Sequence, residues 1–191
     1  YQEMAGDYLY YNGRTSKLSE GSWGIVRVHD KLQKDLKPLP NNLKPRKSAK
    51  QLCPKGAPVK NFSVVAINTA LKFNPNTEDE IEVDFERKLL LTNADAKIFA
   101  LEGEMAKAAV DGKHPHPLTL RANIGECIKI KLTNRLKKSN ASIHANNIAF
   151  DPLDSQGINV GNNPGDQTVK PGKSKVYTFY AHEDFNINGA L

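Results

Sequence analysis

The strand pattern is clearest in the stretch CIKIKL, residues Cys127–Leu132, where apolar and basic side chains alternate over six residues. Such alternation places the apolar side chains on one face of a β-strand and the lysines on the other. We therefore predict a strand with one buried face and one face in water, as in sheets that cover a core on one side only.

Short strands are also predicted on both sides of this stretch. Before it, Leu118–Ala122 reads as a strand and Asn123–Glu126 as the turn that follows. After it, Ala141–Phe150 and Lys175–Ala181 read as strands, separated mainly by a Gly, Asn and Pro-rich loop at Asp151–Asp166. Many short strands separated by turn residues indicate a β-sandwich or a barrel.

The N-terminal segment Tyr1–Asp30 predicts two strands. Asp7–Tyr11 is rich in aromatic residues, and Gly24–Val28 alternates and carries β-branched side chains. Asn12–Gly13 between them is a turn signal. Two or three strands cannot bury a core alone, so this segment must pack onto the rest of the chain or belong to something larger.

The middle of the chain has a mixed pattern. Phe62–Ile67 predicts a strand, and Phe85–Leu91 predicts another. Ala94–Val110 is rich in Ala, Leu, Glu and Lys and predicts a short helix, although its apolar residues form no clean stripe.

The composition is that of an ordinary globular protein: of 191 residues, 39% are hydrophobic and 25% are charged. Much of the net charge of +6 lies in a Pro/Lys-rich stretch, Lys31–Lys60, which reads as a solvated linker. No aromatic residue lies in that stretch, so we expect no nucleic-acid binding. No apolar run reaches the ~18 residues of a membrane-spanning helix.

Several motifs, taken in order, carry a family resemblance. They are GDYLY at Gly6–Tyr10, GSWGIVRV at Gly21–Val28, CPKGAPV at Cys53–Val59, PLTLRANIGEC at Pro117–Cys127, SIH at Ser142–His144, FDP at Phe150–Pro152, Gly157, Val160–Gly161, QTV at Gln167–Val169, Pro171–Gly172 and YTFYA at Tyr177–Ala181. Their order and spacing resemble those of the multicopper oxidases, of the large bacterial kind that includes manganese oxidases.

The resemblance implies an all-β, cupredoxin-like Greek-key β-sandwich, incomplete at both ends. Residues 1–30 correspond to the C-terminal strands of a preceding cupredoxin domain and residues 31–60 to a Pro/Lys-rich linker. Residues 61–191 correspond to a cupredoxin-like domain that lacks its last strands. The partners implied are the remaining cupredoxin domains of the same protein and other subunits of an oxidase complex. The setting implied is extracytoplasmic: secreted, periplasmic, or on a cell or spore surface.

The function implied is that of an oxidase with copper as its cofactor. Such enzymes oxidise a metal ion such as Mn²⁺ or Fe²⁺, or a phenol, and reduce O₂ to water. The resemblance implies that this chain is mainly scaffold near the trinuclear copper region and is inactive by itself. The alternative is a copper-free cupredoxin-like module used for structure or interaction.

One residue is a candidate copper ligand. His144 matches the first histidine of the family's His-x-His pair, and imidazole suits copper. The second position is Asn146, and an amide is a poor copper ligand. The alternative for His144 is a half-buried strand histidine with a hydrogen-bond partner. Weaker metal candidates, each better read as a solvated loop or strand end, are His114 with His116, His182, and the acidic run Thr77–Glu80.

Cys53 and Cys127 are the only cysteines of the chain. The resemblance and an exported setting both suggest a disulfide between them. Closing a loop of this length contributes about 4 kcal/mol in the chain-entropy estimate. Two buried free thiols, or a type 1 copper ligand at Cys127, are the alternatives.

Overall fold

In the computed structural model the described residues are 4–13, 15–36, 51–72, 81–84, 87–89, 92–105 and 118–182. Over these residues the chain is mostly β, as predicted, with one five-residue helix and one short 3₁₀ helix. The strands form one five-stranded sheet and two two-stranded ribbons. None of the described helices is long and apolar enough to cross a membrane.

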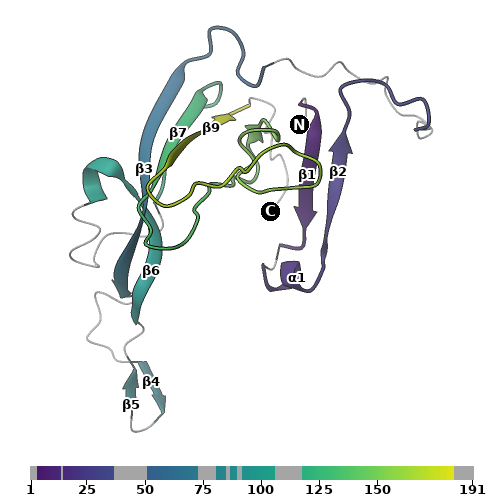
Figure 1. The fold of residues 1–191 in the computed structure, drawn as a ribbon. Coiled ribbons are helices and arrows are strands. Elements are labelled where there is room, and N and C mark those ends of the chain that lie inside the picture. The colour runs from purple at the N-terminus through teal and green to yellow at the C-terminus, as the bar shows by residue number, and fades with distance from the viewer. Residues whose placement is uncertain are drawn as a thin grey trace.

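The five-stranded sheet has the strand order β6-β3-β7-β9-β8 and is curled (Figure 1). Its strands are β3 (Val59–Lys72), β6 (Thr92–Leu101), β7 (Cys127–Asn134), β8 (Ala149–Phe150) and β9 (Ser174–Tyr180). β3 pairs antiparallel with β6 and parallel with β7, and β9 pairs antiparallel with β7 and β8. The sheet is therefore mixed, and the chain crosses over between β3 and β7.

β7 has the buried face and the exposed face that its sequence predicts. Ile128, Ile130 and Leu132 are buried, whereas Lys129 and Lys131 are exposed. The buried face joins the main core, whose other members are Val64, Ala66, Leu136, Ala141, Val169, Tyr177 and Phe179. β3 and β9, both expected from the sequence, supply part of this core. Apolar burial along three neighbouring strands therefore stabilises the sheet.

β3 is buried on both faces. Val64 and Ala66 belong to the main core, while Val65 and Ile67 form a second cluster with Ala100 of β6. A strand covered on both sides reads as a continuous apolar run rather than as an alternation. This explains the run VVAI at the centre of the strand.

The predicted helix at Ala94–Val110 is wrong over Ala94–Leu101, which is strand. Thr92–Leu101 forms β6 along β3, and a 3₁₀ helix at Glu102–Glu104 follows it. Ala96 and Ala100, spaced by an even number of residues, are both buried. Pairing with a buried strand therefore outweighs the helix propensity of Ala and Lys.

Two further predicted strands are also corrected. Leu118–Ala122 lies in no strand, and Ala141–Phe150 is a strand only at its last two residues, β8. Ala141 itself makes one isolated bridge. Between these points His144 donates to the Gln156 carbonyl and Asn146 donates to the Tyr11 hydroxyl, so these side chains contact a loop and the hairpin.

One of the two ribbons joins β4 (Ile81–Asp84) to β5 (Arg87–Leu89). β5 falls within the predicted strand Phe85–Leu91. This ribbon pairs with no described strand of the five-stranded sheet.

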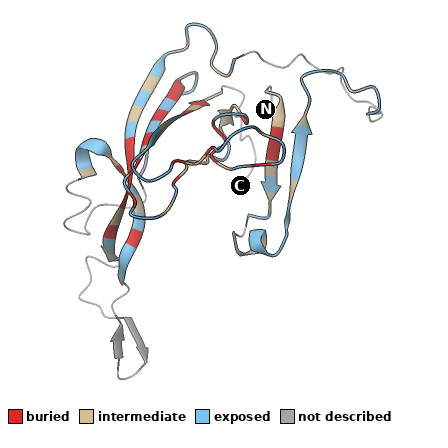
Figure 2. Ribbon diagram, in the orientation of Figure 1, coloured by how far each residue is buried: buried red, intermediate tan, exposed pale blue. Residues whose placement is uncertain are grey.

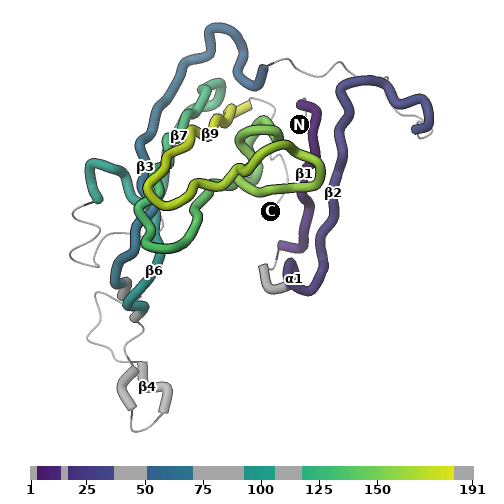
Figure 3. Tube along the Cα trace, viewed as in Figure 1, coloured from purple at the N-terminus to yellow at the C-terminus, as the bar shows by residue number. Residues whose placement is uncertain are grey.

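The other ribbon is a hairpin of β1 (Gly6–Tyr11) and β2 (Trp23–Val28), joined by a connection that contains α1 (Thr15–Ser19). Both strands agree with the sequence prediction. The hairpin stands beside the sheet, and the chain between β7 and β9 passes between the two (Figure 1, Figure 3). Figure 2 shows buried residues on β1, on the strands of the sheet and along that connecting chain.

The predicted disulfide between Cys53 and Cys127 is confirmed, with Cα atoms 5.7 Å apart and a sequence separation of 74. It lies at the N-terminal ends of β3 and β7, because Val59 pairs with Cys127 and the Cys127 amide donates to the Pro58 carbonyl at 2.8 Å. The bond therefore ties the end of the predicted linker to the sheet. β3 begins at Val59, slightly before the expected domain boundary.

Candidate functional site

The hairpin contacts residues 144–163, which we call the junction segment, through a buried carboxylate. Asp7 on β1 is 2% exposed. Its Oδ1 and Oδ2 accept hydrogen bonds from the Arg27 guanidinium at 2.7 and 2.8 Å, and Oδ2 also accepts from the Asn162 amide at 2.7 Å. Arg27 lies opposite Asp7 in the hairpin register. One carboxylate therefore joins the two strands to each other and to the junction segment.

These contacts stabilise the ionised form of Asp7. The Arg27 guanidinium and then the Asn162 amide lower the pKa of Asp7 to about 2, against the smaller opposing effect of burial. The charges of Arg27 and His29 also lower the pKa of Asp7. Hydrogen bonds and opposite charges directed at a carboxylate favour its charged form. The ion pair is therefore intact at neutral pH.

Two side-chain amides extend the contact to the β1 backbone. Asn163 Oδ1 accepts from the Asp7 amide and Asn163 Nδ2 donates to the Asp7 carbonyl, both at 2.8 Å. Gln156 is 1% exposed. In the orientation of its side-chain amide that satisfies both groups, the nitrogen donates to the Asp7 carbonyl at 2.9 Å. The oxygen then accepts from the Leu9 amide at 3.2 Å. These amides satisfy backbone groups of β1 that a neighbouring strand would otherwise pair.

The close approach of the two parts depends on Gly161, whose φ is +51°. A Cβ at this position would lie 2.0 Å from Asp7 Oδ2. Gly6, at the start of β1, leaves similar room, since a Cβ there would lie 2.5 Å from Pro152 Cγ. Glycine allows both the backbone conformation at Gly161 and the short separation.

The junction segment is itself braced from the sheet side. Gln167 is 2% exposed. Its Oε1 accepts from the Gly157 amide at 3.0 Å, and its Nε2 donates to the Pro152 carbonyl at 2.6 Å. The Tyr177 hydroxyl of β9 donates to the Gln167 carbonyl. The surface that receives the hairpin is therefore held in place by buried, satisfied polar groups.

The candidate copper ligand His144 lies in the junction segment and is half-buried. Its Nδ1 lies 2.7 Å from the Gln156 carbonyl oxygen, an acceptor, so Nδ1 carries the proton and donates. Its Nε2 lies 3.2 Å from Asn146 Oδ1, and Asn146 Nδ2 donates to the Tyr11 hydroxyl at 3.4 Å. Its ring meets the Phe150 ring edge-on, with centroids 5.9 Å apart. With Nδ1 protonated, Nε2 carries a lone pair and makes no hydrogen bond with the Asn146 oxygen, which is also an acceptor.

The described residues do not make a copper centre. Such a centre needs several imidazole or thiolate ligands converging on the metal. Among the described ranges no group of three or more His, Cys, Asp and Glu side chains could hold a metal ion. Cys127 is not a type 1 copper ligand, because its sulfur is in the disulfide. The only imidazole that the resemblance selects, His144, stands beside an amide rather than a second imidazole.

Of the other predicted metal ligands, most lie outside the described residues. His114, His116 and Thr77–Glu80 lie outside the described residues. His182, just after β9, meets the Tyr180 ring edge-on with centroids 5.7 Å apart. Of these candidates only His182 is placed by the structure, and its ring packs against another ring.

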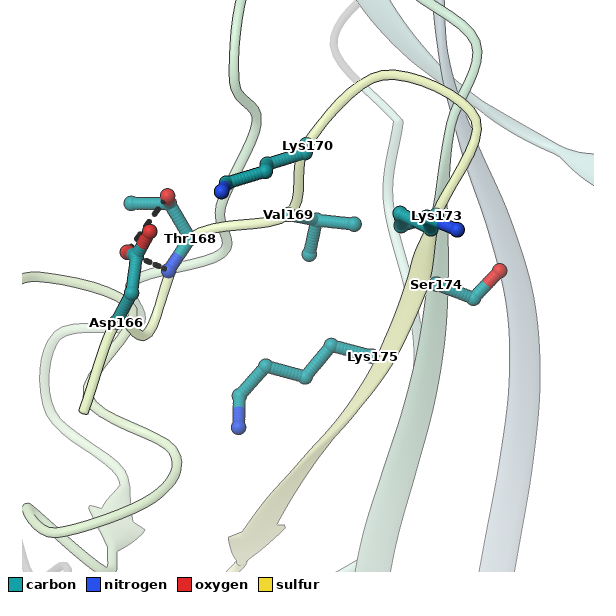
Figure 4. Close-up of a pocket in the computed structure, with 7 residues that line it drawn as sticks. All are labelled: Asp166, Thr168, Val169, Lys170, Lys173, Ser174 and Lys175. Carbon is teal, nitrogen blue, oxygen red and sulfur yellow. Dashed lines mark hydrogen bonds between the residues drawn. The ribbon is translucent and has the colours of Figure 1, made fainter.

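An open pocket of about 360 Å³ lies beside β9, among residues 166–175. Three lysines line it, but their ammonium groups do not converge on one point (Figure 4). Lys175 Nζ donates to Asp154 at 2.8 Å, and Lys173 points away from Asp166. Hydrogen bonds from the Thr168 amide and hydroxyl lower the pKa of Asp166 to about 2. The pocket is mixed in charge, and we assign it no ligand.

Sequence reasoning singled out His144 but missed the residues that hold the hairpin. The sequence pattern places Asp7 in an aromatic strand and Asn163 and Gln156 in a polar loop. An available signal was the hairpin register, which sets Asp7 opposite Arg27 as a pair of opposite charges. No local pattern connects Asn163 to β1, because that contact joins residues 156 positions apart.

Comparison with known proteins adds no relative. A scan against models of known protein families finds no match, and a search of curated proteins finds no significant similarity. The resemblance to multicopper oxidases therefore rests on the sequence motifs.

Proposed function

We propose that this chain is a scaffold in a multicopper oxidase, where it holds the end of one cupredoxin domain against the next. The observation that carries the proposal is the docking of the hairpin on the junction segment through Asp7, Asn163 and Gln156. In the motif resemblance, the hairpin and the sheet belong to successive domains. A buried and fully hydrogen-bonded contact suits a fixed joint between domains better than a flexible tether.

We also propose that the sheet belongs to a cupredoxin-like Greek-key β-sandwich. The curled five-stranded sheet provides one layer, with β7 and β9 burying their apolar side chains on its inner face. Ile143 and Ala145, which lie outside the sheet, pack against this core. A second layer over a buried sheet face is what a sandwich requires.

The oxidase chemistry belongs to the whole protein in this proposal. Copper, when bound, would carry electrons from a metal ion such as Mn²⁺ or Fe²⁺, or from a phenol, to O₂. The residues described here hold no set of ligands for it, so this chain is proposed to be inactive by itself. The disulfide accords with an extracytoplasmic setting, because such bonds persist in oxidising compartments.

A second candidate is a copper-free structural or interaction module with no oxidase around it. The lack of a metal-holding group among the described residues favours this candidate. Asn146 in place of a second histidine favours it as well.

Analysis of the native protein from its source tests the two against each other. Intact mass, copper content and an electron paramagnetic resonance spectrum would be measured on the same sample. We expect a mass far above that of a 191-residue chain, several copper ions and a type 1 signal. A mass equal to that of this chain, with no copper, would overturn the oxidase proposal and leave the copper-free module.

A further inference from the structure

The His144 ring lies beside a polar route to the hairpin. Its Nε2 lies 3.2 Å from Asn146 Oδ1. Asn146 in turn donates from Nδ2 to the Tyr11 hydroxyl at 3.4 Å. Tyr11 is the last residue of β1, so this route ends on the hairpin.

The same ring reaches the hairpin along an aromatic route. The His144 and Phe150 rings are 5.9 Å apart at an interplanar angle of 68°. Phe150 also faces the Tyr8 ring, with centroids 5.8 Å apart. Tyr8 belongs to β1 and is 6% exposed, and its burial raises the pKa of its hydroxyl. Aromatic pairs at these separations contribute beyond simple area burial.

A third connection runs through the other ring nitrogen. Nδ1 donates to the Gln156 carbonyl at 2.7 Å, which holds the backbone of Gln156. The Gln156 side-chain amide meets the Asp7 carbonyl and the Leu9 amide. Each of the three neighbours of the imidazole, Asn146, Phe150 and Gln156, therefore contacts a residue of β1.

We propose that His144 is a positioning residue of the junction, whose ring holds Asn146, Phe150 and Gln156 in place to receive the hairpin. Its Nδ1 donates to the Gln156 carbonyl, and this bond orients the ring between Asn146 and Phe150. The inference goes beyond the proposed function, because it holds whether or not the chain belongs to an oxidase. A failure of this inference can be told apart from a failure of the proposed function. The inference is tested on variants of this chain, whereas the proposed function is tested by the copper content of the native protein.

The single tryptophan, Trp23, reports on the hairpin because it pairs with Tyr11 in the register. The full chain would be unfolded in urea, with Trp23 fluorescence following the hairpin and far-ultraviolet circular dichroism following the sheet. For His144→Ala we expect the undocking equilibrium constant to rise about tenfold, since the hydrogen bond to the Gln156 carbonyl and the ring contact with Phe150 are lost. The sheet transition should move less than the Trp23 transition.

Matched variants separate this role from a general loss of stability. His144→Asn keeps a donor near the place of Nδ1 and should restore about a third of the effect in the same fluorescence assay. His182→Ala removes a histidine that packs on Tyr180 and should leave the Trp23 transition unchanged. Tyr11→Phe removes only the phenolic hydroxyl. Tyr10→Phe is its control, because Tyr10 lies on the same strand and is 59% exposed. The double variant Tyr11→Phe with His144→Ala should lose less docking free energy than the sum of the losses in the two single variants.

Titration with Cu²⁺ alone completes the test. The wild-type chain and His144→Ala should bind the same number of copper ions per chain. A copper ion lost in His144→Ala but not in His182→Ala would overturn the proposal and make His144 a ligand. The proposal would also fail if the Trp23 and circular dichroism transitions of His144→Ala shifted together by the same amount.

Discussion

The five-stranded sheet and the β1–β2 hairpin are both made of strands, but different interactions hold them. In the sheet, Val64, Leu132 and Phe179 are each no more than 1% exposed and lie in one apolar core. In the hairpin, β2 has no buried residue and Trp23 is 51% exposed. The hairpin is held mainly by contacts of β1, where Asp7 and Tyr8 are buried.

This difference sets how each part should respond to change. An apolar core is non-directional and adapts to small shifts, whereas hydrogen bonds require their geometry. A two-stranded ribbon has little stability of its own. The hairpin should therefore behave as a local unit that undocks before the sheet unfolds. A change in the apolar core should move the unfolding transition of the sheet, and a change at Asp7 should move that of the hairpin.

Leu132→Ala should damage the sheet. Removing a fully buried leucine from β7 should lower the free energy of unfolding by about 3 kcal/mol, through lost apolar contacts and a residual cavity. Urea unfolding followed by circular dichroism measures this. Val176→Ala on β9, where Val176 is 45% exposed, is the control and should stay within about 0.5 kcal/mol. Equal losses in the two variants would contradict a core centred on Leu132.

Asp7→Ala should loosen the hairpin. The change removes the bonds from Arg27 and the Asn162 amide, and we expect docking to weaken by about 2 kcal/mol, since Arg27 is half-exposed and partly solvated. Trp23 fluorescence during urea unfolding measures it. Glu20→Ala breaks the exposed Lys17–Glu20 pair on the same hairpin and should have almost no effect. If both variants behaved alike, the buried carboxylate would not be the main contact.

Gly161→Ala tests the close approach of the junction segment to Asp7. The new Cβ would meet Asp7 Oδ2. Docking should therefore weaken by about 1 kcal/mol more than in a control variant that carries only the backbone strain of a positive φ. Gly165→Ala is that variant, because Gly165 has a φ of +75° but no atom within 4 Å of the added Cβ. The comparison uses the Trp23 transition of each variant. No difference between them would show that the segment moves aside freely.

Acid should release the hairpin progressively. The folded pKa of Asp7 is about 2, below its ordinary value of 3.8, so its stabilising effect is complete above about pH 4 and is lost as the pH falls towards 2. Trp23 fluorescence against pH follows this loss, which Asp7→Asn should reduce. Asp166 has a similarly lowered pKa and adds an acid dependence that Asp7→Asn leaves in place. An unchanged acid profile in Asp7→Asn would exclude Asp7 as the contributing carboxylate.

The strands that depend on local pattern were predictable, and those that depend on distant partners were not. β7 and β9 follow a two-residue alternation that any sheet partner would satisfy. The sequence of β6 predicts a helix, because Ala, Leu and Lys favour helices when the partner strand is unknown. The stretch before Phe150 predicts a strand, but Asn147 there has a φ of +58°, which is outside the strand region.

Sequence alone predicts the β class, the buried face of β7 and the identity of the only two cysteines that could pair. Those features depend on side-chain period and residue type, which are local properties. The hydrogen bond from the Asn162 amide to Asp7 of β1 joins residues 155 positions apart, and it depends on the tertiary structure. Such contacts require a hydrogen-bond donor and an acceptor from distant parts of the chain to be brought within about 3 Å, and no local pattern encodes that distance.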